Sequence, residues 1–268
     1  MDKRPIGIFD SGIGGLTVYQ EIRQQFPHED IIYFGDTARV PYGPKSSRTV
    51  IAYSVQNARF LLQNGAKIIV IACNTSSAVA LDHLHEILQV PVMGVIEPGA
   101  RAAADRTKNG LIGVIGTSGT IKSEAYPKAI ARIDPALQVF SQACPLLVPL
   151  VEEGWNSHSV TRTIITEYLE PLLKENIDTL VLGCTHYPIL KPQIGEVLGD
   201  DINMVDSAQS LADELRKILP EPAVQGRGTE DFFVSDDEER FSLIASHILK
   251  REIKTLRKVT LGESWYLH

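Results

Sequence analysis

An internal repeat is the feature that most constrains the fold of this chain. IGIFDSG, residues 6–12, matches IGVIGTS, residues 112–118, at an offset of 106 residues. VIACNTSSA matches VLGCTHYPI, so that Cys73 corresponds to Cys184 at an offset of 111 residues. The two offsets differ by about five residues, which is an ordinary loop insertion, because surface connections tolerate changes in length. Several matching blocks in the same order predict two related halves.

Short β-branched runs alternate with segments of helical periodicity in both halves. Near-continuous apolar strands separated by helices are typical of parallel sheets that are covered on both faces. The expected strands are residues 6–9, 31–34, 68–71, 92–95, 111–115, 138–140, 180–182 and 203–205. The sequence therefore predicts an α/β fold of two similar domains with mainly parallel sheets flanked by helices.

The last part of the chain has no counterpart in the repeat. A helix is expected over 207–218, and a strand and a helix over 232–250. We expect this segment to return and complete the first domain. The predicted domains are then 1–96 plus 207–268 and, between them, 97–206.

Two helices carry start or stop signals. Ser46 or Ser47 is expected to cap a helix that Gly65 ends. Its counterpart in the second half contains Pro171, which disfavours a straight helix there.

Composition excludes several classes of function. The net charge is −7, the pI is near 5.5 and no long basic run occurs, which argues against binding to nucleic acid or to anionic membranes. No apolar stretch reaches about 18 residues and no signal peptide is apparent, so we expect a cytoplasmic protein. Three cysteines without CxxC or paired metal-ligand spacing predict reduced thiols and no metal site.

Polar motifs follow the expected strands at their carboxyl ends, where ligands collect in open parallel sheets. The motifs are FDSGIGG (9–15), FGDTARVPYG (34–43), ACNTSSA (72–78), GTSGT (116–120) and GCTHYP (183–188). Their clustering predicts a functional cleft. The glycines of DSGIGG follow neither GxGxxG nor the P-loop pattern, which disfavours a nucleotide site.

Cys73 and Cys184 each end a strand-like run and precede polar residues at an expected helix start. Free N–H groups and the helix dipole there are expected to lower the pKa of a thiol and favour a thiolate base or nucleophile. Paired thiols suit a reaction in which a proton leaves one face of a carbon and returns to the other. The alternative is that both are small buried hydrophobic residues. Cys144 belongs to no pair and is expected to be structural.

Charged side chains near the thiols are candidates to assist proton transfer, because neighbouring charges tune the pKa of a general acid or base. Asp10 follows the first strand and His186 lies two residues beyond the second thiol. Glu152 and Glu153 lie opposite FGDTARVPYG in the repeat, so Glu152 and Asp36 are candidates for a second pair of assisting groups. Turn capping, an ordinary buried histidine and solvated loop acids remain the alternatives.

Donor groups at the same strand ends allow an acidic protein to bind an acidic substrate. The candidates for binding the substrate are Ser11, Tyr42, Gly43, Asn74, Thr75, Thr117, Thr120, Thr185 and His186. Helix capping by serine and threonine remains the alternative.

Seven motifs in order resemble the bacterial glutamate racemases of the cofactor-independent aspartate/glutamate racemase family: GIFDSGIGGLTV, YFGDTARVPYG, ACNTSSA, GVIEPG, GTSGT, PLVEEG and LGCTHYPIL. The resemblance covers nearly the full length. It implies domains related by pseudo-twofold symmetry, with the active site at the interdomain cleft. There Cys73 and Cys184 would be the two bases that flank the α-carbon of glutamate. Asp10 would assist Cys73, and His186 with Glu152 would assist Cys184.

The resemblance also implies the wider role. It implies no metal or pyridoxal cofactor, glutamate as the small-molecule substrate and a cytoplasmic homodimer. The D-glutamate would supply peptidoglycan synthesis, and thereby the cell wall and cell shape. Three alternatives stay open: a racemase for aspartate or another acidic substrate, a non-catalytic protein that keeps the cleft, and a thiol-redox enzyme. The last is disfavoured, because the two cysteines are far apart in sequence and form no CxxC.

Overall fold

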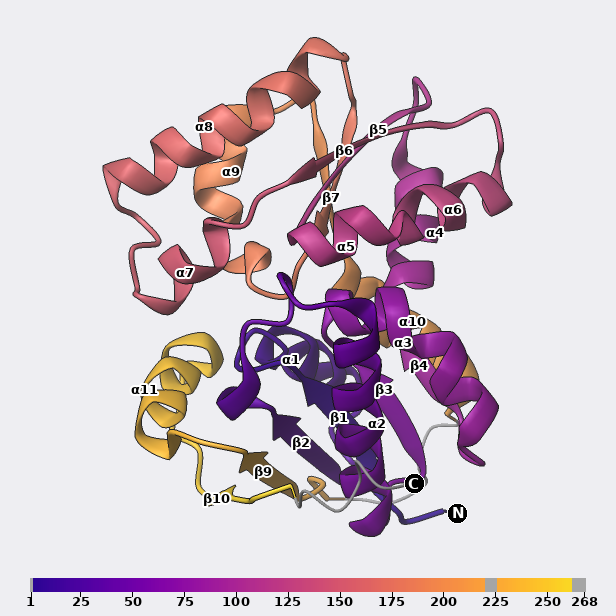
Figure 1. Ribbon diagram of the computed structural model, residues 1–268, viewed down its shortest axis with the longest axis vertical. Coiled ribbons are helices and arrows are strands. Elements are labelled where there is room, and N and C mark those ends of the chain that lie inside the picture. The colour runs from indigo at the N-terminus through magenta and orange to yellow at the C-terminus, as the bar shows by residue number, and fades with distance from the viewer. Residues whose placement is uncertain (1, 220–225, 262–268) are drawn as a thin grey trace.

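The computed structural model describes residues 2–219 and 226–261 and has two parallel sheets flanked by helices (Figure 1). Within these residues the strand orders are β10-β9-β2-β1-β3-β4 and β6-β5-β7-β8, and every neighbouring pair is parallel. The strands are β1 (Ile6–Asp10), β2 (Ile31–Gly35), β3 (Ile68–Ile71), β4 (Val92–Gly94), β5 (Leu111–Gly116), β6 (Gln138–Ala143), β7 (Thr179–Gly183), β8 (Asn203–Asp206), β9 (Glu230–Val234) and β10 (Leu256–Lys258). The predicted α/β class is confirmed.

Helices connect the strands. The α-helices are α1 (Leu16–Gln25), α2 (Ser47–Gln63), α3 (Asn74–Ile87), α4 (Ile96–Arg106), α5 (Ser118–Ser123), α6 (Ala125–Ile133), α7 (Leu147–Glu152), α8 (Ser159–Lys174), α9 (Lys191–Leu198), α10 (Ser207–Ile218) and α11 (Glu238–Leu249). Two short 3-10 helices are η1 (Thr37–Arg39) and η2 (Tyr187–Leu190). No helix among the described residues is both long enough and apolar enough to cross a membrane.

The start and stop signals in the sequence coincide with the ends of α2, whereas the proline in α8 lies inside the helix. The backbone N–H of Thr49 donates to the hydroxyl of Ser46, which caps α2, and Gly65 follows the helix with a φ of +84°. Pro171 does not end the helix, because α8 continues to Lys174. Pro171 and Glu167, whose carbonyl loses its donor, are both exposed, so water replaces the missing hydrogen bond.

The repeat seen in the sequence reappears in the order of the strands. The order β2-β1-β3-β4 in the larger sheet has the same form as β6-β5-β7-β8 in the smaller one. β3 and β7, which precede Cys73 and Cys184, therefore occupy equivalent places. The pseudo-twofold relation between the two halves stays a prediction.

The C-terminal segment joins the larger sheet. β9 pairs with β2, and Tyr33 lies opposite Phe232 in this pair. Figure 1 shows β9, β10 and α11, drawn in yellow, beside β2. β10 was not predicted, and 220–225 and 262–268 lie outside the described residues. The domain boundaries after residues 96 and 206 stay a prediction.

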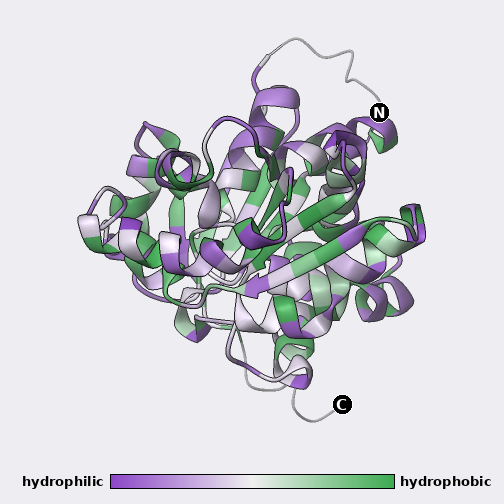
Figure 2. Cartoon of the chain, turned by 90° about the horizontal axis from the view of Figure 1, so that it is seen from above, coloured by the Kyte–Doolittle hydropathy of each residue, from purple (hydrophilic) through white to green (hydrophobic). Residues whose placement is uncertain are grey.

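Both faces of the larger sheet are buried. Ile8 and Tyr33 belong to one hydrophobic cluster, whereas their neighbours Phe9 and Phe34 belong to another. Figure 2 shows hydrophobic residues concentrated along the strands and polar residues on the outer helices. Each fully buried side chain of this size stabilises the fold by about 1.5–3 kcal/mol, so the strands hold their carboxyl ends in place.

Candidate active site

A cavity of about 30 Å³ lies between loops from both sheets. Its walls come from the segments after β1, β2 and β3 and from those after β5, β6 and β7. The lining residues are Ser11, Val40, Pro41, Tyr42, Gly43, Cys73, Asn74, Thr75, Thr117, Val148, Glu152, Cys184, Thr185 and His186. A volume of this size holds about one or two water molecules.

The structure brings most of the predicted site residues to this one cavity. Asp10, Asp36 and Thr120 are the predicted residues that do not line it. Three apolar lining residues, Val40, Pro41 and Val148, were not among the candidates. The first two belong to FGDTARVPYG, which the sequence had already singled out, whereas nothing marked Val148.

Cys73 is the N-cap residue of α3 and is buried. The predicted effect of the helix start is present, since the Ser76 backbone N–H lowers the pKa of this thiol, but other effects outweigh it. Burial raises the pKa of Cys73 to about 11, and the nearby Asp10 carboxylate adds to the increase. Hydrogen bonds from the Ser76 backbone N–H and the Ser11 hydroxyl oppose the rise without cancelling it. Cys73 is therefore a protonated thiol at neutral pH.

Cys184 has different surroundings. The expected helix start is only a four-residue 3-10 helix, η2, and the α-helix α9 begins at Lys191. The helix dipole is accordingly weak at this sulfur. Cys184 Sγ instead lies 3.8 Å from Nδ1 of His186. A protonated imidazole at that position stabilises a thiolate.

His186 joins the second thiol to a carboxylate. Its Nε2 lies 3.2 Å from Oε1 of Glu152. Burial opposes the charged ring, but the contacts with Cys184 and Glu152 outweigh it and raise the pKa of His186 to about 10. Burial likewise opposes the Glu152 carboxylate, yet the hydrogen bond and charge of His186 lower the pKa of Glu152 overall. Glu153 has no such contact and pairs with Arg240 on the surface.

Replacing His186 by asparagine is expected to destabilise the protein more near pH 6 than near pH 10. The pKa of about 10 lies above the ordinary value of 6.5, so the charged ring stabilises the fold fully below about pH 6.5. That stabilisation is lost as the pH rises from about 6.5 through 10. The free energy of unfolding in urea, measured for both proteins across this window, checks the prediction.

The exposed His83 provides the control. His83→Asn should change the free energy of unfolding only slightly, because an exposed side chain contributes little to stability. A difference between the wild type and His186→Asn that stays constant across the window would contradict the assignment of a charged, buried His186.

Asp10 is fully buried and contacts residues of both halves. Its Oδ2 accepts from the Gly12 backbone N–H at 2.9 Å, and its Oδ1 accepts from the Thr185 hydroxyl at 3.4 Å. Burial raises the pKa of Asp10 against the opposing charge of His186. Gly14 lets the segment after β1 lie close to His186, because a Cβ at this position would lie 2.5 Å from Nδ1 of His186. Asp10 is thus held beside the cavity without lining it.

Three threonine hydroxyls join the two halves beside the cavity. Thr75 Oγ1 lies 2.8 Å from that of Thr117 and 3.3 Å from that of Thr120, and the latter two are 3.1 Å apart. The neighbouring Asn74 accepts from the Tyr126 hydroxyl through Oδ1 at 2.8 Å, which leaves its buried Nδ2 without a partner. An unpartnered donor is costly to bury, and a carboxylate oxygen in the cavity would satisfy it.

Asp36 is fully buried but anchors a loop instead of facing either thiol. Its carboxylate accepts from Arg39 Nε at 2.7 and 2.9 Å, from the Ser235 hydroxyl at 2.9 Å, and from the Tyr42 hydroxyl. Tyr42 and Gly43 of the same segment line the cavity. The geometry therefore gives Asp36 a part in placing this segment.

Asp36→Asn is expected to lower the free energy of unfolding by about 2 kcal/mol. Removing one partner of a fully buried ion pair costs about 3–5 kcal/mol, and the partial exposure of Arg39 reduces this. Urea denaturation measures the change. The control is Asp2→Asn, which breaks the exposed pair with Arg4 and should change the free energy of unfolding much less, because water screens exposed charges. Equal costs for the two variants would contradict the anchoring role.

The described residues contain no group of three or more His, Cys, Asp or Glu side chains placed to hold a metal ion. The residues that meet at the cavity are thiols, an imidazole, carboxylates and neutral hydrogen-bond donors. Such groups bind a polar molecule and transfer protons.

Comparison with known proteins gives the family. The family model for Asp/Glu/Hydantoin racemases matches residues 6–215. A glutamate racemase of Geobacter metallireducens is 50% identical over 266 residues, which cover 97% of this chain and 98% of that protein. The crystal structure of glutamate racemase isoform RacE1 from Bacillus anthracis is similar with a TM-score of 0.92 and 43% identity, covering 97% of this chain and 99% of that one.

A third similar protein was crystallised with a ligand. The glutamate racemase of Francisella tularensis in complex with D-glutamate gives a TM-score of 0.91 at 38% identity, covering 98% of this chain and 99% of that one. The chain therefore belongs to the Asp/Glu/Hydantoin racemase family, and it is an isomerase, an amino-acid racemase.

Proposed function

We propose that this protein interconverts L-glutamate and D-glutamate by a two-base mechanism that uses Cys73 and Cys184. One observation carries the proposal: two cysteines that follow equivalent strands of two sheets line the same cavity. Relatives that match nearly the whole chain are glutamate racemases, which supports glutamate as the substrate.

The reaction needs one thiol to act as the base and the other as the acid. His186 lies beside Cys184, whereas burial keeps Cys73 protonated, so we assign Cys184 as the first base. In one direction the Cys184 thiolate removes the α-proton, and the Cys73 thiol donates its proton to the opposite face of the carbanion. The enzyme is then left with a Cys184 thiol and a Cys73 thiolate. This form can bind the opposite enantiomer and run the reaction in reverse. Alternatively, the two thiols exchange protons with water, which restores the starting form.

The groups around the thiols support binding of a dicarboxylate. No lysine or arginine of the described residues lines the cavity, so neutral donors would hold the substrate. The unpartnered Asn74 Nδ2 and the threonine hydroxyls are suitable donors, as are the segments at Ser11, Gly43 and Thr185. Asp10 would assist Cys73, and Glu152 would act through His186 on Cys184. In a site closed to water, such donors stabilise a developing carbanion strongly.

The wider role is proposed from the same relatives. The D-glutamate would supply peptidoglycan synthesis in the cytoplasm, and the active form would be a homodimer. Light scattering of the purified protein tests the dimer. Rescue of bacteria that require D-glutamate tests the role in cell-wall synthesis.

Circular dichroism tests the reaction directly. Purified protein is added to L-glutamate or to D-glutamate, with a chelator and without any cofactor. The signal is expected to decay to zero from either side, since a racemate has no net optical activity. Aspartate is the comparison substrate and should turn over more slowly. A constant signal from a folded protein would refute the proposal.

A further inference from the structure

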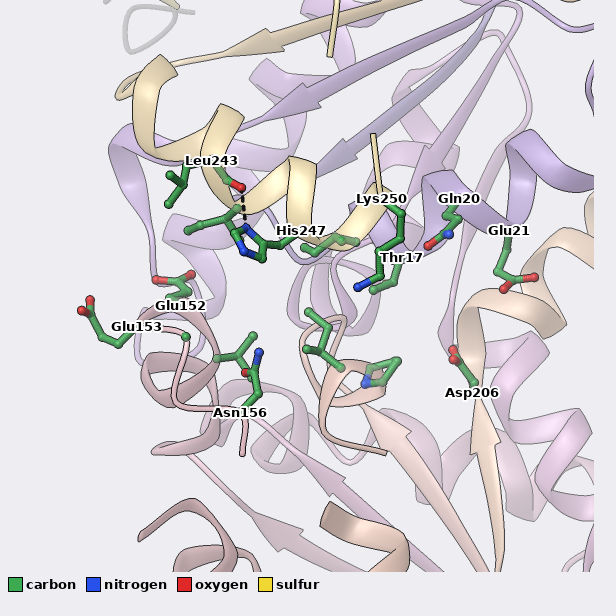
Figure 3. A pocket seen from close by; sticks show the side chains of 16 residues that line it. Thr17, Gln20, Glu21, Glu152, Glu153, Asn156, Asp206, Leu243, His247 and Lys250 are labelled. Atoms are coloured by element: carbon green, nitrogen blue, oxygen red, sulfur yellow. Dashed lines mark hydrogen bonds between the residues drawn. The ribbon is translucent and has the colours of Figure 1, made fainter. Parts of the chain in front are cut away.

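Glu152 lies where three cavities meet. It lines the catalytic cavity, a second cavity of about 130 Å³ and a third of about 550 Å³. Val40 shares the first two, so Glu152 and Val40 form the wall between them. Figure 3 shows Glu152 and Glu153 at the edge of the third cavity, facing the helix that carries Leu243 and His247. This helix is α11.

Arg240 reaches across from α11. Its Nη2 donates to Oε1 of Glu153 at 2.9 Å, and its side chain lines the second cavity together with Glu152. α11 belongs to the segment that completes the larger sheet, whereas Glu152 and Glu153 end α7, which packs against α8 and η2. The arginine therefore links the two halves of the molecule beside the acid that contacts His186.

Charges alternate in sign from this arginine to the imidazole beside the second thiol. The Arg240 cation acts on Glu152, Glu152 contacts His186, and His186 lies beside Cys184. Arg240 adds to the lowering of the pKa of Glu152, after the larger effects of His186. The titratable groups that line the second and third cavities from the other elements are Asp237, His247, Lys250, Glu21 and Asp206.

The groups that shift the pKa of Cys73 include no counterpart of His186 or Arg240. Asp10, Ser11 and Ser76 are the groups that shift its pKa, and none of them is a cation. A change at Arg240 should consequently act on one of the two bases and leave the other unchanged.

We infer that Arg240 is a positioning residue for the Cys184 side of the reaction, holding Glu152 by its charge and α7 through its ion pair with Glu153. This inference rests on the proposed two-base racemisation. Arg240 is half exposed and does not line the catalytic cavity, so it acts only through the two glutamates.

The test compares Arg240→Gln with Arg240→Lys and Arg257→Gln. Arg257 pairs with Asp231 on the same C-terminal segment, is similarly exposed and lines none of the three cavities, which makes it a matched control. We expect Arg240→Gln to lower kcat about two- to fivefold for the enantiomer whose proton Cys184 removes, the range for a partly exposed charge pair. The opposite direction should change less. Arg240→Lys should restore most of the loss.

Two results would overturn the inference: equal kcat changes in both directions, or an Arg240→Gln variant that behaves like Arg257→Gln. The wild type, assayed beside the variants, separates the two claims. An inactive wild type would refute the proposed racemisation itself. An active wild type with an unaffected Arg240→Gln variant would refute only the role of Arg240.

Discussion

Cys73→Ser and Cys184→Ser are each expected to lower kcat for glutamate racemisation by about 10²–10⁴-fold, the usual contribution of a positioned acid or base. A serine hydroxyl is too weak a base to replace a thiolate, and both groups are needed because one removes the proton that the other must replace. Circular dichroism measures racemisation, and mass spectrometry of glutamate recovered from deuterium oxide measures exchange of the α-proton.

Cys144 provides the control. It is buried and free, but it does not line the cavity, so Cys144→Ser should keep its activity. Unfolding in urea confirms that each variant is folded. Full activity in either Cys73→Ser or Cys184→Ser would exclude the two-base mechanism, while leaving the membership of the family untouched.

Asp10→Asn and His186→Asn are expected to lower kcat by about 10- to 100-fold, each more strongly in one direction and the two in opposite directions. The reason is that His186 contacts Cys184, whereas Asp10 acts on Cys73. The asymmetry has a thermodynamic limit. Enantiomers have equal free energies in water, and both directions cross the same transition states, so kcat/KM must be equal for L- and D-glutamate in every variant.

The asymmetry must therefore appear in kcat, with KM falling in proportion in the more impaired direction. Glutamate deuterated at the α-carbon gives a second measure. In His186→Asn the isotope effect should increase for the enantiomer whose proton Cys184 removes, and in Asp10→Asn for the other. Equal isotope effects for the two enantiomers in both variants would show that these residues are only structural.

The two-sheet architecture was predictable because its signals are local. Each strand is a short apolar run with a polar motif after it, and the carboxyl ends of neighbouring parallel strands must meet. The sequence therefore identified the segments that line the cavity, including the pairing of Cys73 with Cys184. β10 escaped prediction because Leu256–Lys258 is too short and too charged to give an apolar signal.

The electrostatics of the site were not predictable in the same way. The pKa of Cys73 depends on burial between two halves of the chain, which no local pattern reveals. Asp36 looked like a possible assistant, but Arg39 and Ser235, which hold it, are brought together only by folding. Arg240 and Glu153 are likewise far apart in sequence and meet across the two halves.

The small catalytic cavity has a consequence for affinity. A space for about one or two water molecules is smaller than glutamate, so we expect the loops around it to move apart when the substrate binds. If substrate binds only to a more open member of the ensemble, the smaller the fraction of molecules in that state, the weaker the apparent affinity for glutamate. A substitution that destabilises the closed form alone would then strengthen the initial binding of glutamate. The same substitution would weaken the stabilisation of the carbanion. Affinity for glutamate and speed of racemisation are thus set by opposing demands on one conformational equilibrium.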